Sequence, residues 1–301
     1  MVNAKRLLES LHSVFTPGTP VAEARFLVGR GALLKRMERA FRTRGKSVVT
    51  FGDRAVGKTS LCKIAARSQR RPMFYRSVGR GDTFETVIDS LLDRFEIDRA
   101  VAEIERSTTA EKSAEVGIAK TGGRLGHSSE TRMLIRRRTL DLTPDQLAEK
   151  LTGIPGIAII DDFEIMLEET RLGFSELIKK LSDHQADLVL ILVGVAKSAS
   201  ELVRNYADVA KLVEEIAVPS IDQADLRRLI QDGLRRLDID ITPEAEHHIL
   251  QRSLGFPHLV HQYCLDCVYE LMERIRSEEK DAWLISTDEI ELAEAARATV
   301  G

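Results

Sequence analysis

The spacing of hydrophobic and polar residues changes once along the chain, near residue 220. Before that point, short runs that are apolar at every position alternate with stretches whose apolar residues recur at helical spacing. Strands that are apolar on both faces, each followed by a helix, are typical of a parallel sheet covered by helices on both sides. The expected strands span residues 47–51, 72–78, 156–166, 186–196 and 212–220.

Beyond residue 220 the helical period continues alone, and no convincing strand interrupts it. Helices are expected over residues 222–238, 242–254, 256–279 and 286–298. We therefore expect two domains: an α/β domain over residues 1–220, whose sheet is sandwiched by helices, and a small all-α domain over residues 221–301. A chain of 301 residues is long enough for both, since compact domains usually have about 100 to 200 residues.

Residues 105–142 do not follow either pattern. This stretch is polar, contains glycines and is only weakly periodic, so we expect an insertion that is partly a loose hairpin and partly flexible. Two basic clusters stand out, one over residues 67–80 and one at the end of the insertion, formed by Arg132, Arg136, Arg137 and Arg138. Such clusters can bind the phosphates of a nucleic acid or a partner, although arginines on a helix or strand face are more often simply solvated.

The composition excludes several other classes of protein. Hydrophobic residues make up 43% of the chain and charged residues 30%, which is ordinary for a folded globular protein. The net charge of -3 provides no overall field that attracts nucleic acid or an anionic membrane. No apolar run is long enough for a signal peptide or a membrane helix, so we expect a cytoplasmic protein without a membrane partner. The three cysteines are too few for a disulfide framework.

The sequence GDRAVGKT, directly after the expected strand 47–51, fits the pattern G-x-x-x-x-G-K-[ST] of a P-loop. Gly52 and Gly57 let the loop wrap around phosphate with its amide hydrogens pointing inward, and the following helix adds the positive end of its dipole. Lys58 is expected to reach the β- and γ-phosphates, and the Thr59 hydroxyl to bind Mg²⁺. The other loop positions expected to contact nucleotide are Asp53, Arg54, Ala55, Val56 and Ser60.

A Mg²⁺ site in this kind of fold needs an acidic residue at the carboxyl end of a neighbouring strand. The sequence IAIIDDFE supplies it, and Asp161 is the expected Mg²⁺ ligand, directly or through water. Asp162 is expected to orient or deprotonate the attacking water. Glu164 is a rival for this catalytic role. Side chains alternate between the two faces of a strand, so Glu164 lies on the same side as Asp162 if the strand continues that far.

The segments FLVGR, FGDRAVGKTSL, IIDDFE, LVLILVGVA and GFPHLVHQY occur in an order that resembles the bacterial AAA+/STAND-type ATPases related to the origin-recognition clade. The likeness covers about residues 20–275. It implies a P-loop NTPase domain with a helical lid, ATP or ADP as ligand, and ATP hydrolysis. By the same resemblance, nucleotide contacts outside the phosphate loop come from Val28, Gly29 and Arg30 beside the adenine or ribose, and from a lid turn with Gly255 and Pro257. His258 is a further candidate contact from the lid.

Two positions depart from the pattern of the family. Many relatives end the fourth strand with a polar sensor, whereas this chain has the sequence GVA, starting at Gly194, and leaves Lys197 or Ser198 as candidates. Where a trans-acting arginine is often found before the fifth strand, this chain has Lys211, with Arg204 earlier. Lysine lacks the planar fork that braces a transferring phosphoryl group, so we expect slow turnover or a nucleotide-state switch.

The sequence HLVHQYCLDC spaces His258, His261, Cys264 and Cys267 by three residues, which suggests a metal site at first sight. On a helix, however, the two cysteines share one apolar stripe with their hydrophobic neighbours, and steps of three drift away from any single face. No second pair of cysteines exists to complete a zinc site. We therefore expect buried thiols in the core of the lid.

The expected function is that of an ATP-binding, slowly hydrolysing ATPase that works as a nucleotide-dependent switch or assembly module. Because no further motif follows the lid before Gly301, we expect a partner protein to carry the output, and self-oligomerisation remains open. One alternative is a nucleic-acid-bound, ATP-dependent assembly factor in replication, transposition or defence, which would bind through the arginines at 132–138. A small-molecule kinase is disfavoured by the paired acids on a distal strand.

Overall fold

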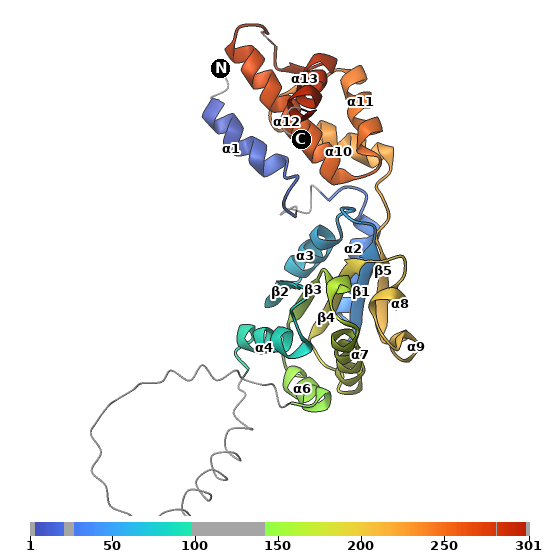
Figure 1. Ribbon diagram of the computed structural model, residues 1–301. Helices are drawn as coiled ribbons and strands as arrows, with labels where there is room; N and C mark the ends of the chain where they lie inside the picture. Colours follow the sequence, from blue (N-terminus) through green and yellow to red (C-terminus); the bar gives the residue numbers. More distant parts are fainter. Residues whose placement is uncertain (1–3, 21–26, 98–141, 281, 299–301) are drawn as a thin grey trace, which may run out of the picture.

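The computed structural model describes residues 4–20, 27–97, 142–280 and 282–298. Figure 1 shows an α/β domain and a helical domain joined end to end, with the N-terminal helix lying beside the helical one. The insertion expected at residues 105–142, including the arginines at 132–138, lies outside the described residues except for its last position.

A five-stranded sheet forms the centre of the α/β domain. Its strands are β1 (Ser47–Gly52), β2 (Met73–Ser77), β3 (Ile157–Asp161), β4 (Val189–Val195) and β5 (Val213–Ala217). They are parallel and follow the order β2-β3-β4-β1-β5. All the strands therefore end at the same edge of the sheet, which in open α/β sheets is the edge where ligands bind.

Helices cover both faces of this sheet, as the apolar runs predict. One face packs on α2 (Gly31–Phe41) and α3 (Lys58–Ser68). The other packs on α4 (Phe84–Arg94), α6 (Pro144–Leu151), α7 (Glu168–Asp183), α8 (Ala199–Leu202) and α9 (Tyr206–Val209). Along β3, Ile157 and Ile159 are buried on the first face, and Ala158 and Ile160 on the second. A strand buried on both faces needs apolar residues at consecutive positions.

The helical lid contains α10 (Gln223–Arg235), α11 (Pro243–Ser253), α12 (Pro257–Arg276) and α13 (Thr287–Ala298). Between these helices, β6 (Asp240–Ile241) pairs in parallel with β7 (Leu284–Ile285). The prediction that no strand follows residue 220 is therefore wrong at this small sheet. A strand of two residues is too short for hydrophobic periodicity to reveal it.

The N-terminal helix α1 (Ala4–Val14) packs against the lid, although its sequence position groups it with the expected 1–220 domain. Its apolar face contributes to the same buried cluster as the lid helices. Phe15, directly after the helix, approaches α10 so closely that a Cβ on Gly233 would lie 2.5 Å from its ring. Helix α1 thus belongs to the lid, whereas the next described helix, α2, packs on the sheet (Figure 1).

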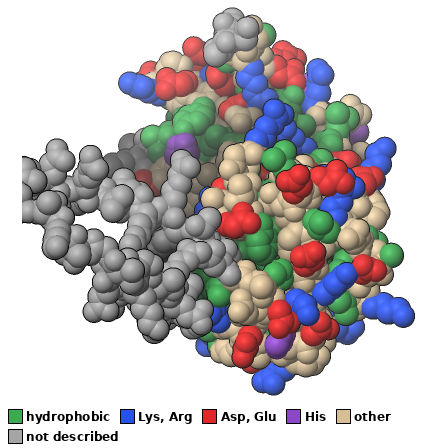
Figure 2. All heavy atoms as spheres, turned by 60° about the horizontal axis from the view of Figure 1, so that its bottom comes forward, with side chains coloured by type: hydrophobic (Ala, Val, Ile, Leu, Met, Phe, Trp, Pro, Cys, Tyr) green, Lys and Arg blue, Asp and Glu red, His purple; other side chains and the backbone are tan. Residues whose placement is uncertain are grey.

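On the face that Figure 2 presents, acidic and basic side chains are interspersed, in keeping with the net charge of -3 for the whole chain. Among the described residues, no helix has the length and hydrophobicity needed to cross a membrane.

Candidate nucleotide-binding site

The loop between β1 and α3 has the backbone geometry that the P-loop pattern predicts. Gly57 has a φ of 93°, which residues with a side chain rarely adopt. At Gly52, a Cβ would lie 2.3 Å from the carbonyl oxygen of Val218, in the segment that leaves β5. The first glycine is thus required by close packing of two backbone segments, and the second by the left-handed turn that starts α3.

Lys58 is folded inward within this loop. Its ammonium donates hydrogen bonds to the carbonyl oxygens of Gly52 at 3.1 Å and Asp53 at 2.7 Å. Burial lowers the pKa of Lys58, and the charge of the Glu164 carboxylate is the largest effect that opposes this. The ammonium and the first amides of α3 therefore form a positive site at the helix N-terminus, where anions are stabilised.

Asp161, the last residue of β3, lies next to the start of α3. Its Oδ2 accepts a hydrogen bond of 2.7 Å from the Thr59 hydroxyl and one of 3.1 Å from the Tyr75 hydroxyl. Its Oδ1 accepts one of 3.0 Å from the backbone N–H of Asp162. Burial raises the pKa of Tyr75, and the charge of Asp161 raises it further, so this phenol remains a donor.

The Thr59 and Asp161 oxygens fit the ligand preference of Mg²⁺, which binds hard oxygen donors and completes its coordination with phosphate oxygens and water. Asp161 is buried, with only 4% of its surface exposed, so its carboxylate is fixed in place rather than solvated. Among the described residues no group of three or more His, Cys, Asp or Glu side chains forms a metal site. A cation held by Thr59 and Asp161 would thus take its remaining ligands from phosphate oxygens and water.

Asp162 and Glu164 differ in their surroundings. The expected strand 156–166 ends earlier, because β3 stops at Asp161 and a 3₁₀ turn, η2 (Phe163–Ile165), follows. Asp162 has a left-handed backbone with a φ of 57°, and its Oδ2 accepts a hydrogen bond of 2.5 Å from Ser77 on β2. Oε2 of Glu164 is buried and has no hydrogen-bond partner among the described residues.

A cavity of about 430 Å³ lies between the carboxyl edge of the sheet and the lid. Its walls include the phosphate loop from Arg54 to Ser60, the acidic residues at 161, 162 and 164, and the lid residues Pro257 and His258. Val28 and Arg30 also line it. Gly52 and Asp53 lie at the base of the loop instead, where their carbonyl groups hold Lys58. The structure thus gathers most of the predicted residues of both domains around one cavity, although Gly29 and Gly255 are not part of its lining. The cavity is large enough for a small ligand.

Arg30 is buried, with 3% of its surface exposed, and its contacts are with backbone. Its guanidinium donates hydrogen bonds to the carbonyl oxygens of Val56 in the phosphate loop and Pro219 in the connector to the lid. Burial lowers the pKa of Arg30, while the charge of Asp225 on α10 opposes the change. Its side chain therefore joins the loop to the connector, in addition to lining the cavity.

The lid side of the cavity contains two histidines at the start of α12. Nδ1 of His258 is buried without a hydrogen-bond partner among the described residues. Nδ1 of His261 accepts a hydrogen bond of 3.2 Å from the backbone N–H of Thr16. Burial lowers the pKa of His261 to about 4, with a smaller contribution from His258. His261 is therefore neutral near pH 7 and ties residue 16 to the lid.

Several cavity residues were not predicted to contact a nucleotide. Residues 16–20, His261, Gly194 and Val195 line the cavity, and Tyr75 and Ser77 bond to the acidic residues. The latter two lie on β2, which pairs with β3 so that Ser77 is opposite Asp161. The turn TPGTP at residues 16–20 lies at the cavity because α1, which precedes it, docks on the lid.

The candidates for a polar sensor and a trans-acting arginine lie away from the cavity lining. The backbone N–H of Lys197 donates to Glu201, and Ser198 is the N-cap position of α8. Arg204 forms an ion pair with Glu168. The carbonyl of Lys211 accepts a hydrogen bond from Lys46. The roles of these residues as a sensor or a trans-acting group therefore remain predictions.

The two sequence signals set aside above have structural roles. Cys264 and Cys267 are fully buried in the lid core, which confirms the expectation of core thiols. In the cluster at 67–80, Arg71 donates to the carbonyl of Phe41 and Arg76 pairs with Asp82. The side chains of these two arginines therefore make contacts within the protein.

The fold is similar to those of solved structures that include RuvB, a Walker-type ATPase and Cdc6p. No protein-family model matches the sequence, and a search among curated proteins returns no match. Solved structures are similar at low identity, so the likeness concerns the fold.

Three solved structures illustrate this similarity. The RuvB Holliday junction branch migration motor of Thermotoga maritima is 13% identical, with a TM-score of 0.54 and coverage of 90% of this chain and 70% of that one. Cdc6p from Pyrobaculum aerophilum is 14% identical, with a TM-score of 0.57 and coverage of 90% and 68%. A Walker-type ATPase of Pyrococcus abyssi is 16% identical, with a TM-score of 0.54 and coverage of 87% and 78%.

Proposed function

We propose that this protein binds ATP with Mg²⁺ and hydrolyses it slowly, as a nucleotide-dependent switch or assembly module for a partner protein. The observation that carries the proposal is the 2.7 Å hydrogen bond from the Thr59 hydroxyl to Asp161. It brings the two expected Mg²⁺ ligands, 102 positions apart in the sequence, together beside the cavity that the lid closes.

The residues around this pair have complementary roles toward a bound nucleotide. Lys58 would exchange its carbonyl partners for phosphate oxygens, and the amides at the start of α3 would bind the same group. Thr59 and Asp161 would hold Mg²⁺, which would neutralise charge on the β- and γ-phosphate oxygens. The lid residues and residues 16–20 would enclose the base and ribose and exclude water from them.

We expect slow turnover because few cationic side chains line the cavity. Among the described residues that line it, only Arg30, Arg54 and Lys58 are cationic, and Arg30 is engaged with two backbone carbonyls. A transferring phosphoryl group is usually stabilised by additional positive charge, often from an arginine supplied in trans. We expect another copy of the chain or a partner to supply that charge, so that the isolated protein turns over slowly.

The switch role rests on the connection between the phosphate loop and the lid. Arg30 bonds to both the loop and the connector. The backbone N–H of Ile221, at the end of that connector, donates a hydrogen bond of 3.0 Å to Gly255 in the lid turn. Rearrangement of the loop around a γ-phosphate would therefore shift the connector and the lid together, which is the kind of bistable coupling that nucleotide switches use.

Two measurements test the proposal. Thermal unfolding should shift upward with ATP or ADP and Mg²⁺, since ligand at 100 times its Kd adds about 2.7 kcal/mol of stability. Phosphate release from ATP should be detectable, should require Mg²⁺ and should stop when the cation is chelated. If the melting temperature did not shift at millimolar nucleotide, nucleotide binding would be contradicted. If it shifted as expected but no phosphate were released, hydrolysis would be contradicted.

A further inference from the structure

We infer that Glu164, rather than Asp162, is the carboxylate that activates the attacking water, and that Gly194 positions it. The inference rests on the proposed ATP hydrolysis and identifies which side chain performs its proton transfer. Glu164 lies on the turn after β3, and Gly194 lies near the end of β4, the next strand of the sheet.

The backbone after β3 brings Glu164 back toward β4. Asp162 takes the left-handed conformation at a φ of 57°, which Asp tolerates better than most residues, and η2 begins directly after it. Phe163 anchors this turn, because it is fully buried and its ring packs edge-on to that of Phe174, with the centroids 5.3 Å apart. The turn is therefore fixed by packing, and so is the direction in which Glu164 leaves it.

The carboxylate of Glu164 has the free acceptor that a general base needs. Its Oε2 is buried, has no hydrogen-bond partner among the described residues, and belongs to a residue that lines the cavity. A buried carboxylate oxygen without a donor is costly, and a small rotation that turns the Glu164 carboxyl group into the cavity, where a water molecule can reach it, would supply the missing hydrogen bond. That water would lie between Glu164 and the phosphate bound at Lys58, whose ammonium interacts more strongly with Glu164 than with the other acids.

The carboxylate of Asp162 already accepts a hydrogen bond from another strand. Its Oδ2 accepts the hydroxyl of Ser77 at 2.5 Å, on β2 and thus on the side of β3 that faces away from β4 and β1. Its backbone N–H meanwhile donates to Asp161. Asp162 thus helps to fix the Mg²⁺ ligand and the end of β2, and its carboxylate already has a donor.

Gly194 leaves the space that Glu164 needs. A Cβ on this residue would lie 2.8 Å from Oε2 of Glu164 and 2.6 Å from a methyl carbon of Leu202. Any side chain here would therefore push the carboxylate away from β4. This accounts for the absence of a polar sensor at the end of the strand, because the position next to the phosphate is taken by the acid of η2.

The hydrolysis step moves one proton and exchanges one bond to the γ-phosphorus for another. A water molecule donates one proton to the Glu164 carboxylate while its oxygen forms a bond to the γ-phosphorus. The bond from the γ-phosphorus to the bridging oxygen breaks, and its electron pair stays on the β-phosphate of ADP, close to the Lys58 ammonium. The proton leaves Glu164 with the product phosphate or with solvent.

The test compares Glu164→Gln, Asp162→Asn and, as a matched control outside the cavity, Glu169→Gln in the first turn of α7. Glu164→Gln should reduce kcat by about 100-fold or more, the usual contribution of a general base. It should keep the full thermal shift with ATP and Mg²⁺, which shows that the protein is folded and binds nucleotide. Asp162→Asn should lose clearly less, and Glu169→Gln should match the wild type.

Two further variants distinguish catalysis from structure. Gly194→Ala should lower kcat by about tenfold or more with little change in the KM for ATP, as expected for an effect on the transition state alone. In Glu164→Ala, added formate should restore part of the turnover, because it supplies a carboxylate in the vacated space. Asp162→Ala should not respond to formate.

The outcomes separate this inference from the proposed function. Turnover of Glu164→Gln close to that of wild type, or rescue by formate of Asp162→Ala instead of Glu164→Ala, would overturn the assignment while hydrolysis stands. Wild-type protein that binds ATP without hydrolysing it would overturn both the hydrolysis and the assignment. Wild-type protein that shows no thermal shift would overturn nucleotide binding itself.

Discussion

Arg30 bonds to Val56 across the mouth of the phosphate loop, through a guanidinium N–H that lies 3.1 Å from the carbonyl oxygen. The same nitrogen donates to the carbonyl of Pro219 in the connector between sheet and lid. One carbonyl belongs to the phosphate loop and the other to the connector that leads to the lid. A single buried side chain thus joins the phosphate loop to the lid.

Replacing Arg30 with Met keeps the apolar stem and removes the donor. We expect the free energy of unfolding to fall by about 1.5–3 kcal/mol, the usual value of hydrogen bonds made by a charged group. The coupling between the two domains should weaken as well, so that ATP protects the lid amides from hydrogen exchange less than in the wild type. Denaturant unfolding and hydrogen exchange measure the two effects.

A suitable control is Arg44→Met, because Arg44 pairs with Asp187 at the surface and has 68% of its side chain exposed. That change should cost less than about 1 kcal/mol. If Arg30→Met were as stable as wild type and its lid responded normally to ATP, the bonds to Val56 and Pro219 would not link the loop to the lid.

The ammonium of Lys58 should be required for nucleotide binding and dispensable for folding. Lys58→Ala should abolish the thermal shift with ATP and Mg²⁺, while stability without nucleotide changes by less than about 1 kcal/mol, because removal of a buried cation also removes its desolvation cost. Lys63→Ala is the matched control on the same helix. It also removes a lysine, but one whose ammonium lies over the ring of Tyr75 and not within the phosphate loop. A normal ATP shift in Lys58→Ala would argue against the phosphate loop as the binding site.

The phosphate loop and the acidic strand could be predicted from the sequence because their chemistry is local. Gly52, Gly57, Lys58 and Thr59 lie within one turn and one helix start, and Asp161 ends an apolar run that can only be a buried strand. For such features, the residue types that allow the backbone geometry are also the ones that allow phosphate binding.

The remaining parts of the site depend on tertiary contacts that no local pattern encodes. The direction of Glu164 follows from the left-handed backbone at Asp162, and the role of Tyr75 follows from the neighbouring positions of β2 and β3. The docking of α1 on the lid requires Phe15 to meet Gly233, two residues far apart in the chain. Sequence periodicity identifies which residues are buried in each element, but not which elements meet.

His261 should make the stability of the protein fall under mildly acidic conditions. Burial lowers its pKa to about 4, whereas an unfolded histidine titrates near 6.5. Between these values the unfolded chain binds a proton that the folded chain does not, so stability is complete above about pH 6.5 and is lost as the pH falls toward 4. The loss should be on the order of 3 kcal/mol.

His261→Asn keeps an acceptor for the Thr16 N–H and removes the titrating ring. The variant should therefore show a flatter profile of melting temperature against pH between about 6.5 and 4. The exposed His247 provides the control, because His247→Gln should leave the wild-type profile unchanged. An equally steep profile in His261→Asn would assign the acid sensitivity to another group.

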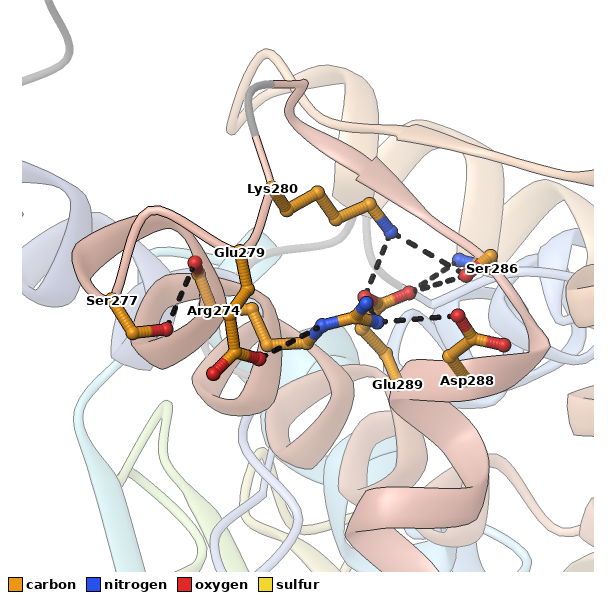
Figure 3. A network of polar contacts seen from close by, with 7 residues as sticks. All are labelled: Arg274, Ser277, Glu279, Lys280, Ser286, Asp288 and Glu289. Carbon is orange, nitrogen blue, oxygen red and sulfur yellow. Dashed lines mark hydrogen bonds and ion pairs between the residues drawn. The ribbon is translucent and has the colours of Figure 1, made fainter.

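Glu289, at the start of α13, is completely buried and holds the end of the lid together (Figure 3). Its Oε1 accepts hydrogen bonds from Arg274 at 2.6 Å and Lys280 at 2.7 Å. Its Oε2 accepts the N–H and the hydroxyl of Ser286, both at 2.7 Å. Burial raises the pKa of Glu289, but the bonds from Lys280 and Ser286 outweigh it and hold the pKa below its ordinary value.

Glu289→Gln should therefore destabilise the lid by about 1–3 kcal/mol at neutral pH, because it replaces an acceptor oxygen with an NH₂ group facing buried donors. The contribution of a carboxyl with a lowered pKa is present above its unfolded pKa of about 4.3 and is lost as the pH falls through the lower folded value. The difference in melting temperature between wild type and Glu289→Gln should therefore be constant from about pH 7 to 5 and shrink below about pH 4. Asp288→Asn, at a neighbouring position with 64% of its side chain exposed, should change stability by less than about 1 kcal/mol. Equal stability of wild type and Glu289→Gln at neutral pH would mean that the network positions α13 without stabilising the lid.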